Sequence, residues 1–244
     1  MRLGEATLPV THPSADLVRK CGACLSKPVK KQLSSSGFEF VTFPVGPLQC
    51  NCSIIWDPSS REAIAVDPGA DAEKILDFIS EQKLSLKAAV HTHAHFDHIG
   101  ASTEVHSRLK APLHLHPDDA DLWDNLDLQG QAFGFPLKKI PRWQVDLHDD
   151  DSLRFGKFHL KILHTPGHTP GSCSFSCNEF VFSGDTLFRG SIGRTDLWGG
   201  DFAQISKSIK ERLYSLDEDT TVICGHGPST TIGIERRKNA FIKG

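Results

Sequence analysis

Apolar and polar residues follow two different periods along the chain, and each change of period marks a change of secondary structure. Short runs with alternating or wholly apolar residues predict strands, and longer runs with apolar residues three and four apart predict helices. In the first half, strands are predicted at 38–43, 52–56, 63–66 and 113–116, with another ending at Ala88-Ala89-Val90. Helices are predicted at 72–84 and 118–126, with a further one starting near 101–105.

The second half repeats this order. Strand pairs are predicted at 153–163, joined at Gly156, and at 172–182, with a turn at 177–179. An amphipathic helix at 202–216 and a strand at 220–224 follow. Strands thus alternate with helices roughly as β-β-α-β-α, twice. This order predicts an α/β fold with two packed sheets and helices on both outer faces, a four-layer αβ/βα sandwich.

The amino-terminal residues do not share this pattern. Residues 1–37 are rich in Thr, Pro, Ser and Lys, show little periodicity and end in a Ser-Ser-Ser-Gly run. We therefore predict an extension at 1–37 and one domain at 38–244. Cys21 and Cys24 form a C-x-x-C in the extension, but no second pair lies at zinc-finger spacing. A turn is the simpler interpretation of this motif, and its role stays open.

Composition excludes several classes of function. The 244 residues carry a formal net charge of −3, so there is no basic surface field to hold nucleic acid or an anionic membrane. No apolar run approaches the length of a membrane span, and the amino terminus has neither a secretory apolar region nor a clean presequence. The seven cysteines are an odd number, which indicates reduced thiols. We expect a cytoplasmic protein.

The segment 93–98, His-Ala-His-Phe-Asp-His, carries the strongest chemical signal. Imidazoles and carboxylates are common ligands of divalent metals. Their spacing is too tight for all four to reach one ion. It predicts two ions side by side, with His93 and His95 on one and Asp97 and His98 on the other. The segment lies between a predicted strand and a predicted helix, where α/β folds place their chemistry.

Three later segments also end strands with possible metal ligands. His168 follows a strand inside a Thr-Pro-Gly-His-Thr-Pro-Gly loop, whose Pro-Gly pairs fix its course. Asp185 ends the apolar run 180–184, where an unpaired carboxylate would be costly. His226 ends the last predicted strand between two glycines. Each signal is weak alone, but together with 93–98 they predict one metal site.

The remaining histidines show no ligand pattern. We expect surface or packing positions for six of them: His12, His106, His114, His116, His148 and His159.

The order H-x-H-x-D-H, His, Asp, His resembles the metallo-β-lactamase superfamily over about residues 38–244. The resemblance implies a first metal held by His93, His95 and His168, and a second held by Asp97, His98 and His226. Asp185 would bridge the two ions. His91 and His164 match no ligand position, and packing or outer positions are expected for them. The implied cofactors are two divalent ions, with zinc expected first and iron or manganese also suited to His/Asp ligands.

Within that superfamily the chain is similar to the short, single-domain branch of glyoxalase II-like hydrolases. The similarity rests on the segments 165–169, 184–188, 193–196 and 225–237. Full-length glyoxalase II enzymes carry a helical carboxyl-terminal domain, and little sequence follows His226 here. Their Gly-Lys-Phe-Tyr segment is replaced by Gly193-Arg194-Thr195-Asp196. Arg194 can meet a glutathione carboxylate as the Lys does, whereas Asp196 cannot act as the Tyr donor.

The resemblance implies a binuclear metallohydrolase that cleaves a small-molecule thioester, with glutathione conjugates among the candidate substrates. A water between two dications loses a proton near neutral pH and attacks the thioester carbonyl. Asp97 and Asp185 are the implied catalytic carboxylates: Asp97 orients the hydroxide and Asp185 joins the metals. Arg194 is the implied substrate-binding residue. The sequence leaves the acyl group, thiol carrier, metal identity and oligomeric state open.

Three other enzyme classes of this fold and a non-enzymatic binding protein are the alternatives to a thioester hydrolase. A persulfide dioxygenase shares the fold and a Gly-Arg-Thr-Asp segment, but uses one iron held by two His and one Asp. β-Lactamases of this fold commonly place Cys where Asp185 stands. Nuclease relatives need a basic surface, which is not visible here. A non-enzymatic binding protein would be expected to have lost ligands, and this chain lacks none.

Overall fold

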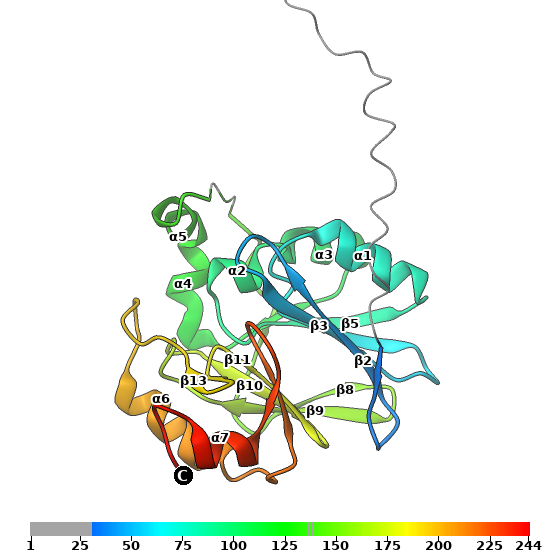
Figure 1. Cartoon of the computed structure of the whole chain (residues 1–244). Helices are drawn as coiled ribbons and strands as arrows, with labels where there is room; N and C mark the ends of the chain where they lie inside the picture. The colour runs from blue at the N-terminus through cyan, green and yellow to red at the C-terminus, as the bar shows by residue number, and fades with distance from the viewer. Residues whose placement is uncertain (1–30, 136, 138) are drawn as a thin grey trace, which may run out of the picture.

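Two β-sheets face each other, and helices lie on the outer side of each (Figure 1). The computed structural model describes residues 31–135, 137 and 139–244. The first sheet has the strand order β1-β2-β3-β4-β5-β6-β7, and the second has the order β15-β14-β11-β10-β9-β8. A two-stranded hairpin, β12-β13, follows β11. The predicted four-layer α/β sandwich is confirmed.

The strands of the first sheet are β1 (Gln32–Leu33), β2 (Glu39–Val45), β3 (Cys50–Trp56), β4 (Glu62–Val66), β5 (Ser85–Val90), β6 (Leu113–Leu115) and β7 (Val145–Asp146). Those of the second sheet and the hairpin are β8 (Ser152–Phe155), β9 (Phe158–His164), β10 (Cys173–Cys177), β11 (Phe180–Gly184), β12 (Leu187–Phe188), β13 (Ser191–Ile192), β14 (Thr221–Cys224) and β15 (Thr230–Thr231). The helices are α1 (Ala72–Glu81), α2 (Phe96–Ile99), α3 (Ser102–Leu109), α4 (Ala120–Asp124), α5 (Leu126–Ala132), α6 (Phe202–Ser208) and α7 (Ile232–Lys238).

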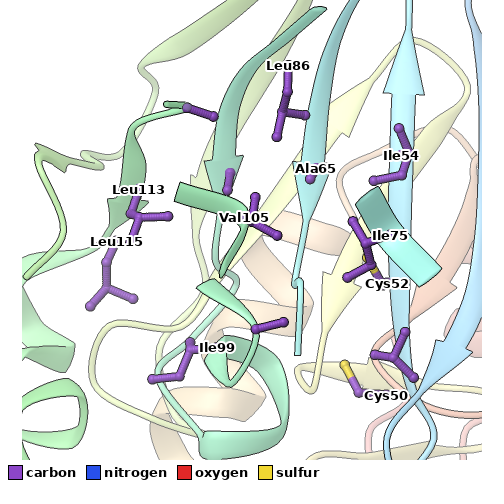
Figure 2. Packing of buried hydrophobic residues seen from close by; sticks show 14 of the residues in the cluster. Cys50, Cys52, Ile54, Ala65, Ile75, Leu86, Ile99, Val105, Leu113 and Leu115 are labelled. Carbon is purple, nitrogen blue, oxygen red and sulfur yellow. The ribbon is translucent and has the colours of Figure 1, made fainter. Parts of the chain in front are cut away.

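Apolar side chains fill the spaces between the layers. Helices α1 and α3 cover the first sheet, where Ile75 and Val105 pack with Ile54 and Ala65 (Figure 2). A second cluster, rich in phenylalanine, lies between the two sheets. A third joins α6 and α7 to the outer face of the second sheet. None of the helices in the described residues has the length and apolar character that a membrane crossing requires.

The first crossover shows how the sequence produces this arrangement. Strands β4 and β5 pair in parallel, and α1 connects them. The apolar face of α1 buries Ile75, Leu76 and Ile79, as its spacing predicts. Because β5 is also paired with β6, it is buried and almost wholly apolar at its carboxyl end. The chain leaving β5 therefore enters the metal-ligand motif from a rigid strand.

Several predicted boundaries differ from the observed ones. Within the described residues, the first strand is β1, which lies before Phe38 because Gln32 and Leu33 pair with the edge of β2. The helix predicted at 118–126 is broken at Asn125 and continues as α5 to Ala132. The helix predicted at 202–216 is α6 followed by π-helical turns at Ile209–Leu213. The short elements β12, β13, β15 and α7 had no sequence prediction. Cys21, Cys24 and His12 lie outside the described residues.

Candidate metal centre

Four segments meet where strands of the two sheets end. The loop after β5 and helix α2 bring the motif from the first sheet, and α2 begins at Phe96, inside the motif rather than after it. The segments after β9, β11 and β14 bring His168, Asp185 and His226 from the second sheet. The Thr92 carbonyl accepts a hydrogen bond from the Cys173 amide at 2.7 Å, which ties the two edges together.

His93, His95 and His168 form one ligand triad. The Nδ1 atom of His95 lies 3.0 Å from His93 Nε2 and 3.0 Å from His168 Nε2. Nitrogen ligands about 2.0–2.1 Å from a tetrahedral zinc ion stand roughly 3.3–3.4 Å apart, so nitrogens at this closer spacing can share a single ion with little movement. The structure thus brings together the three side chains that the resemblance assigned to the first metal.

Asp97, His98 and His226 form a second triad. His226 Nε2 lies 3.2 Å from Asp97 Oδ2 and 3.3 Å from His98 Nε2, and the remaining side of the triangle is 3.8 Å. These ligand atoms are also close enough to share one ion. The division of the motif that its spacing predicted, two ligands to each ion, agrees with this arrangement.

Asp185 lies between the two triads. Its Oδ2 is 3.7 Å from His168 Nε2 and 3.7 Å from His226 Nε2, and its Oδ1 is 3.5 Å from His98 Nε2. Oδ1 is buried and has no hydrogen-bond partner among the described residues. A buried carboxylate oxygen without a donor is costly, so this atom fits a cation between the triads. The structure therefore brings all seven predicted ligand residues together at one centre.

A glycine is required beside that carboxylate. A Cβ atom at Gly225 would lie 2.1 Å from Asp185 Oδ1 and 2.8 Å from the Gly184 carbonyl carbon. Only a residue without a side chain lets the strand ending at Cys224 approach Asp185 so closely.

The two triads differ in their electrostatics. Burial lowers the pKa of His93, His95 and His168, in the case of His95 to about 3, so the first triad has the neutral imidazoles that divalent metals bind. Burial opposes ionisation of Asp97, but the His98 charge and the hydrogen bond from His226 outweigh it and hold the pKa of Asp97 below its usual range. Burial also opposes the charge of His98 and His226, but the anionic groups around them raise the pKa of both, so these two imidazoles would release protons as a metal binds.

The outward nitrogens of three ligands are fixed by hydrogen bonds. His168 Nδ1 donates to the Arg194 carbonyl at 2.7 Å, and His226 Nδ1 donates to the Leu48 carbonyl at 3.0 Å. His98 Nδ1 donates to Asp67 Oδ2 at 3.0 Å. Each bond sets the ring orientation and turns Nε2 toward the centre.

Asp67 is a functional residue that the sequence analysis did not identify. It is buried, and besides His98 it accepts hydrogen bonds from the Thr92 amide and hydroxyl, both at 2.7 Å. It therefore fixes Thr92, which directly precedes the motif, and His98, a ligand of the second triad. Its position at the end of strand β4 is the same signal that identified Asp185.

Asp119 is the second residue that was missed. Its carboxylate is fully buried and accepts hydrogen bonds from the Ala94 and Gly171 amides and the Thr169 hydroxyl. Burial raises the pKa of Asp119 to about 6, and the bonds from Ala94 and Gly171 oppose this, so the carboxylate is ionised at pH 7. Asp119 thus joins the His93–His95 segment to the loop that carries His168.

Three further histidines of the described residues make packing and hydrogen-bond contacts within the protein. His91 is buried and bonds through Nδ1 to the His114 carbonyl and through Nε2 to the Ser102 hydroxyl. His116 and His164 come together with Asp118, but their rings stack with centroids 4.0 Å apart and planes at 7°. One ion cannot lie in the planes of two rings stacked in this way.

Arg194 lies at the rim of the site rather than against the triads. Its Nε and Nη2 donate to the two carboxylate oxygens of Asp196, both at 2.8 Å, and the arginine side chain is 55% exposed. The hydrogen bonds from Arg194 lower the pKa of Asp196 to about 2. The side chain also borders a cavity of about 570 Å³ that opens onto both triads.

Comparison with known proteins agrees with this site. The model of the metallo-beta-lactamase superfamily matches residues 45–226. Hydroxyacylglutathione hydrolase GloC of Haemophilus influenzae is 40% identical, over 82% of this chain and 95% of that protein.

Solved structures give the same picture. BLEG-1 B3 metallo-beta-lactamase (39% identity, TM-score 0.78) covers 84% of this chain and 100% of its own. TTHA1623 in a di-iron-bound form (40%, 0.75) covers 82% and 98%, and ETHE1 from Myxococcus xanthus (26%, 0.68) covers 88% and 84%. With its matched segment, fold and ligand order in agreement, the chain belongs to the metallo-β-lactamase superfamily.

Proposed function

We propose that this protein is a binuclear thioester hydrolase of the hydroxyacylglutathione hydrolase type. The observation that carries the proposal is the pair of complete triads with Asp185 between them. The 40% identity to a protein named hydroxyacylglutathione hydrolase supports the same reaction class. The free, buried cysteines among the described residues fit our further proposal of a cytoplasmic location.

The chain's own groups divide the work of such a reaction. Two bound dications would supply a water with a pKa near neutrality and stabilise a developing oxyanion. Asp97, ionised and 15% exposed, is placed to accept the hydrogen bond of that nucleophile and orient it. Asp67 and the carbonyls of Leu48 and Arg194 keep the imidazoles aimed inward. A thiolate leaves readily, so the site needs no strong general acid.

A persulfide dioxygenase is the alternative, and the likeness to ETHE1 at 26% identity is the observation that favours it. Such a site needs one iron on two His and one Asp. The second triad, Asp97 with His98 and His226, would then have no ligand role. Its close spacing favours the binuclear proposal.

Metal analysis and two assays on the purified protein separate these functions. We expect two metal ions per chain, hydrolysis of S-lactoylglutathione and no oxygen consumption with glutathione persulfide. Chelation should abolish hydrolysis, and zinc, iron or manganese added back singly should show which ion restores it. One iron per chain together with oxygen uptake would establish the dioxygenase instead.

Arg194 is predicted to contact the carboxylate of a glutathione carrier at the rim. Because the guanidinium is exposed and shared with Asp196, we expect Arg194→Ala to raise KM about three- to tenfold, less than a buried charged hydrogen bond would give. The kcat should stay nearly unchanged.

A thioester of N-acetylcysteamine, which lacks the carboxylate, is the matched control substrate. Its KM should not respond to Arg194→Ala. If both substrates keep their KM while the variant loses stability or metal, Arg194 and Asp196 only hold the loop.

A further inference from the structure

The cavity beside the metal centre has mostly apolar walls. Its volume of about 570 Å³ is within the usual range for small-molecule sites. Three segments supply the walls: Leu48 before β3, Leu128 and Phe133 around α5, and Leu197 and Trp198 before α6. In Figure 1, α4 and α5 lie on the same side of the molecule as the loop that leads into α6.

Several of these apolar side chains are exposed. Trp198 is 59% exposed, Leu128 55% and Phe133 48%. Large apolar groups that converge on a functional site in this way mark a surface that a ligand covers. Because His95, Asp97, His168, Asp185 and His226 border the same cavity, a molecule reacting at the metals must lie against these walls.

Few polar side chains other than the metal ligands line the cavity. Gln129 donates to the Ala94 and Leu122 carbonyls and accepts from the Phe96 amide, so its donors are taken up within the protein. Asn125 donates to the Asp121 carbonyl. Arg194 lies at the rim, where it is paired with Asp196. The interior behind the rim therefore offers a ligand mainly apolar contact area.

From these observations we propose that the cavity binds an apolar acyl group, larger than lactoyl, of the thioester substrate. The inference rests on the proposed thioester hydrolysis and names its substrate class. The scissile carbonyl lies at the metal centre, the acyl chain lies among Leu128, Phe133 and Trp198, and the polar thiol carrier extends past the rim. Charged groups of the substrate stay outside, where water solvates them.

A series of N-acetylcysteamine thioesters tests this directly, because the carrier is uncharged and constant. With acetyl, butanoyl, hexanoyl and octanoyl substrates, kcat/KM should rise about two- to fourfold per added methylene, the value for burying apolar surface. Trp198→Ala should flatten this dependence and lower kcat/KM for the octanoyl substrate about tenfold while changing the acetyl substrate little. Phe241→Ala is the matched control, since Phe241 is 60% exposed but does not border the cavity.

Binding of a non-hydrolysable octyl thioether of N-acetylcysteamine, measured by calorimetry, separates the two proposals. Tight binding that Trp198→Ala weakens, with no thioester cleaved, would keep the acyl cavity and reject the hydrolase. Cleavage at rates independent of chain length, or an equal effect of Trp198→Ala on every substrate, would reject the acyl cavity and keep the hydrolase.

Discussion

Asp185→Asn is expected to lower thioester hydrolysis by roughly a thousandfold and to reduce the metal content below two ions per chain. The carboxylate reaches both triads, and its Oδ1 atom has no hydrogen-bond partner within the part of the chain that the structure describes. An amide keeps the shape but removes the charge that two neighbouring cations require. Loss of metal-derived stabilisation worth several kcal/mol corresponds to a rate loss of this size. Metal analysis and steady-state kinetics on the same preparation give both values.

Asp217→Asn makes the same chemical change at an exposed residue that is not one of the seven ligands. This control variant should retain both metals and full activity. Circular dichroism of both variants shows whether the fold is kept. If Asp185→Asn kept two metal ions per chain and an unchanged turnover, Asp185 would not bridge the two ions.

Asp119→Ala is expected to destabilise the protein by about 3–5 kcal/mol, because the Ala94 and Gly171 amides would be left buried without an acceptor. For a chain of this size, the melting temperature should fall by roughly 6–20 °C. The first triad should also bind metal more weakly, since Asp119 joins the segment of His93 and His95 to the loop of His168. Thermal unfolding with and without metal, and metal titration, measure the two effects.

The neighbouring Asp118, whose side chain is 58% exposed, provides the control. Asp118→Ala should change stability by no more than a few tenths of a kcal/mol, as surface substitutions usually do. Equal effects of the two substitutions would show that the hydrogen bonds of Asp119 do not hold the loops in register.

The seven residues that meet at the candidate metal centre could be identified from the sequence, because each lies in a segment that directly follows an apolar strand and carries side chains suited to bind metals. The fold class could also be predicted, since the alternation of strand and helix periods is regular in both halves. Asp119 could not be found, because it follows another aspartate in a polar turn and nothing in that turn reveals burial. Its role depends on Ala94 and Gly171, which approach it only after folding.

The same reasoning explains the misplaced boundaries. The break at Asn125 and the continuation through Gly130 depend on tertiary packing, because Gly130 lies against the Phe135 carbonyl. The sequence could not determine the partner of the Arg194 guanidinium, because a substrate carboxylate and the carboxylate of a neighbouring residue are equally suitable acceptors. The structure shows the neighbour in place.

Each triad takes two ligands from the first sheet side and one from the second, and this division links metal supply to folding. His168 follows His93 by 75 residues, and His226 follows His98 by 128 residues. An ion held by ligands from both sheets binds the folded protein but not a form in which the two halves have separated. At a free metal concentration 100 times the dissociation constant, each ion adds about 2.7 kcal/mol to the free energy of unfolding. When metal is scarce, the protein therefore loses its catalytic ions and, at the same time, the contacts through which those ions hold its two halves together.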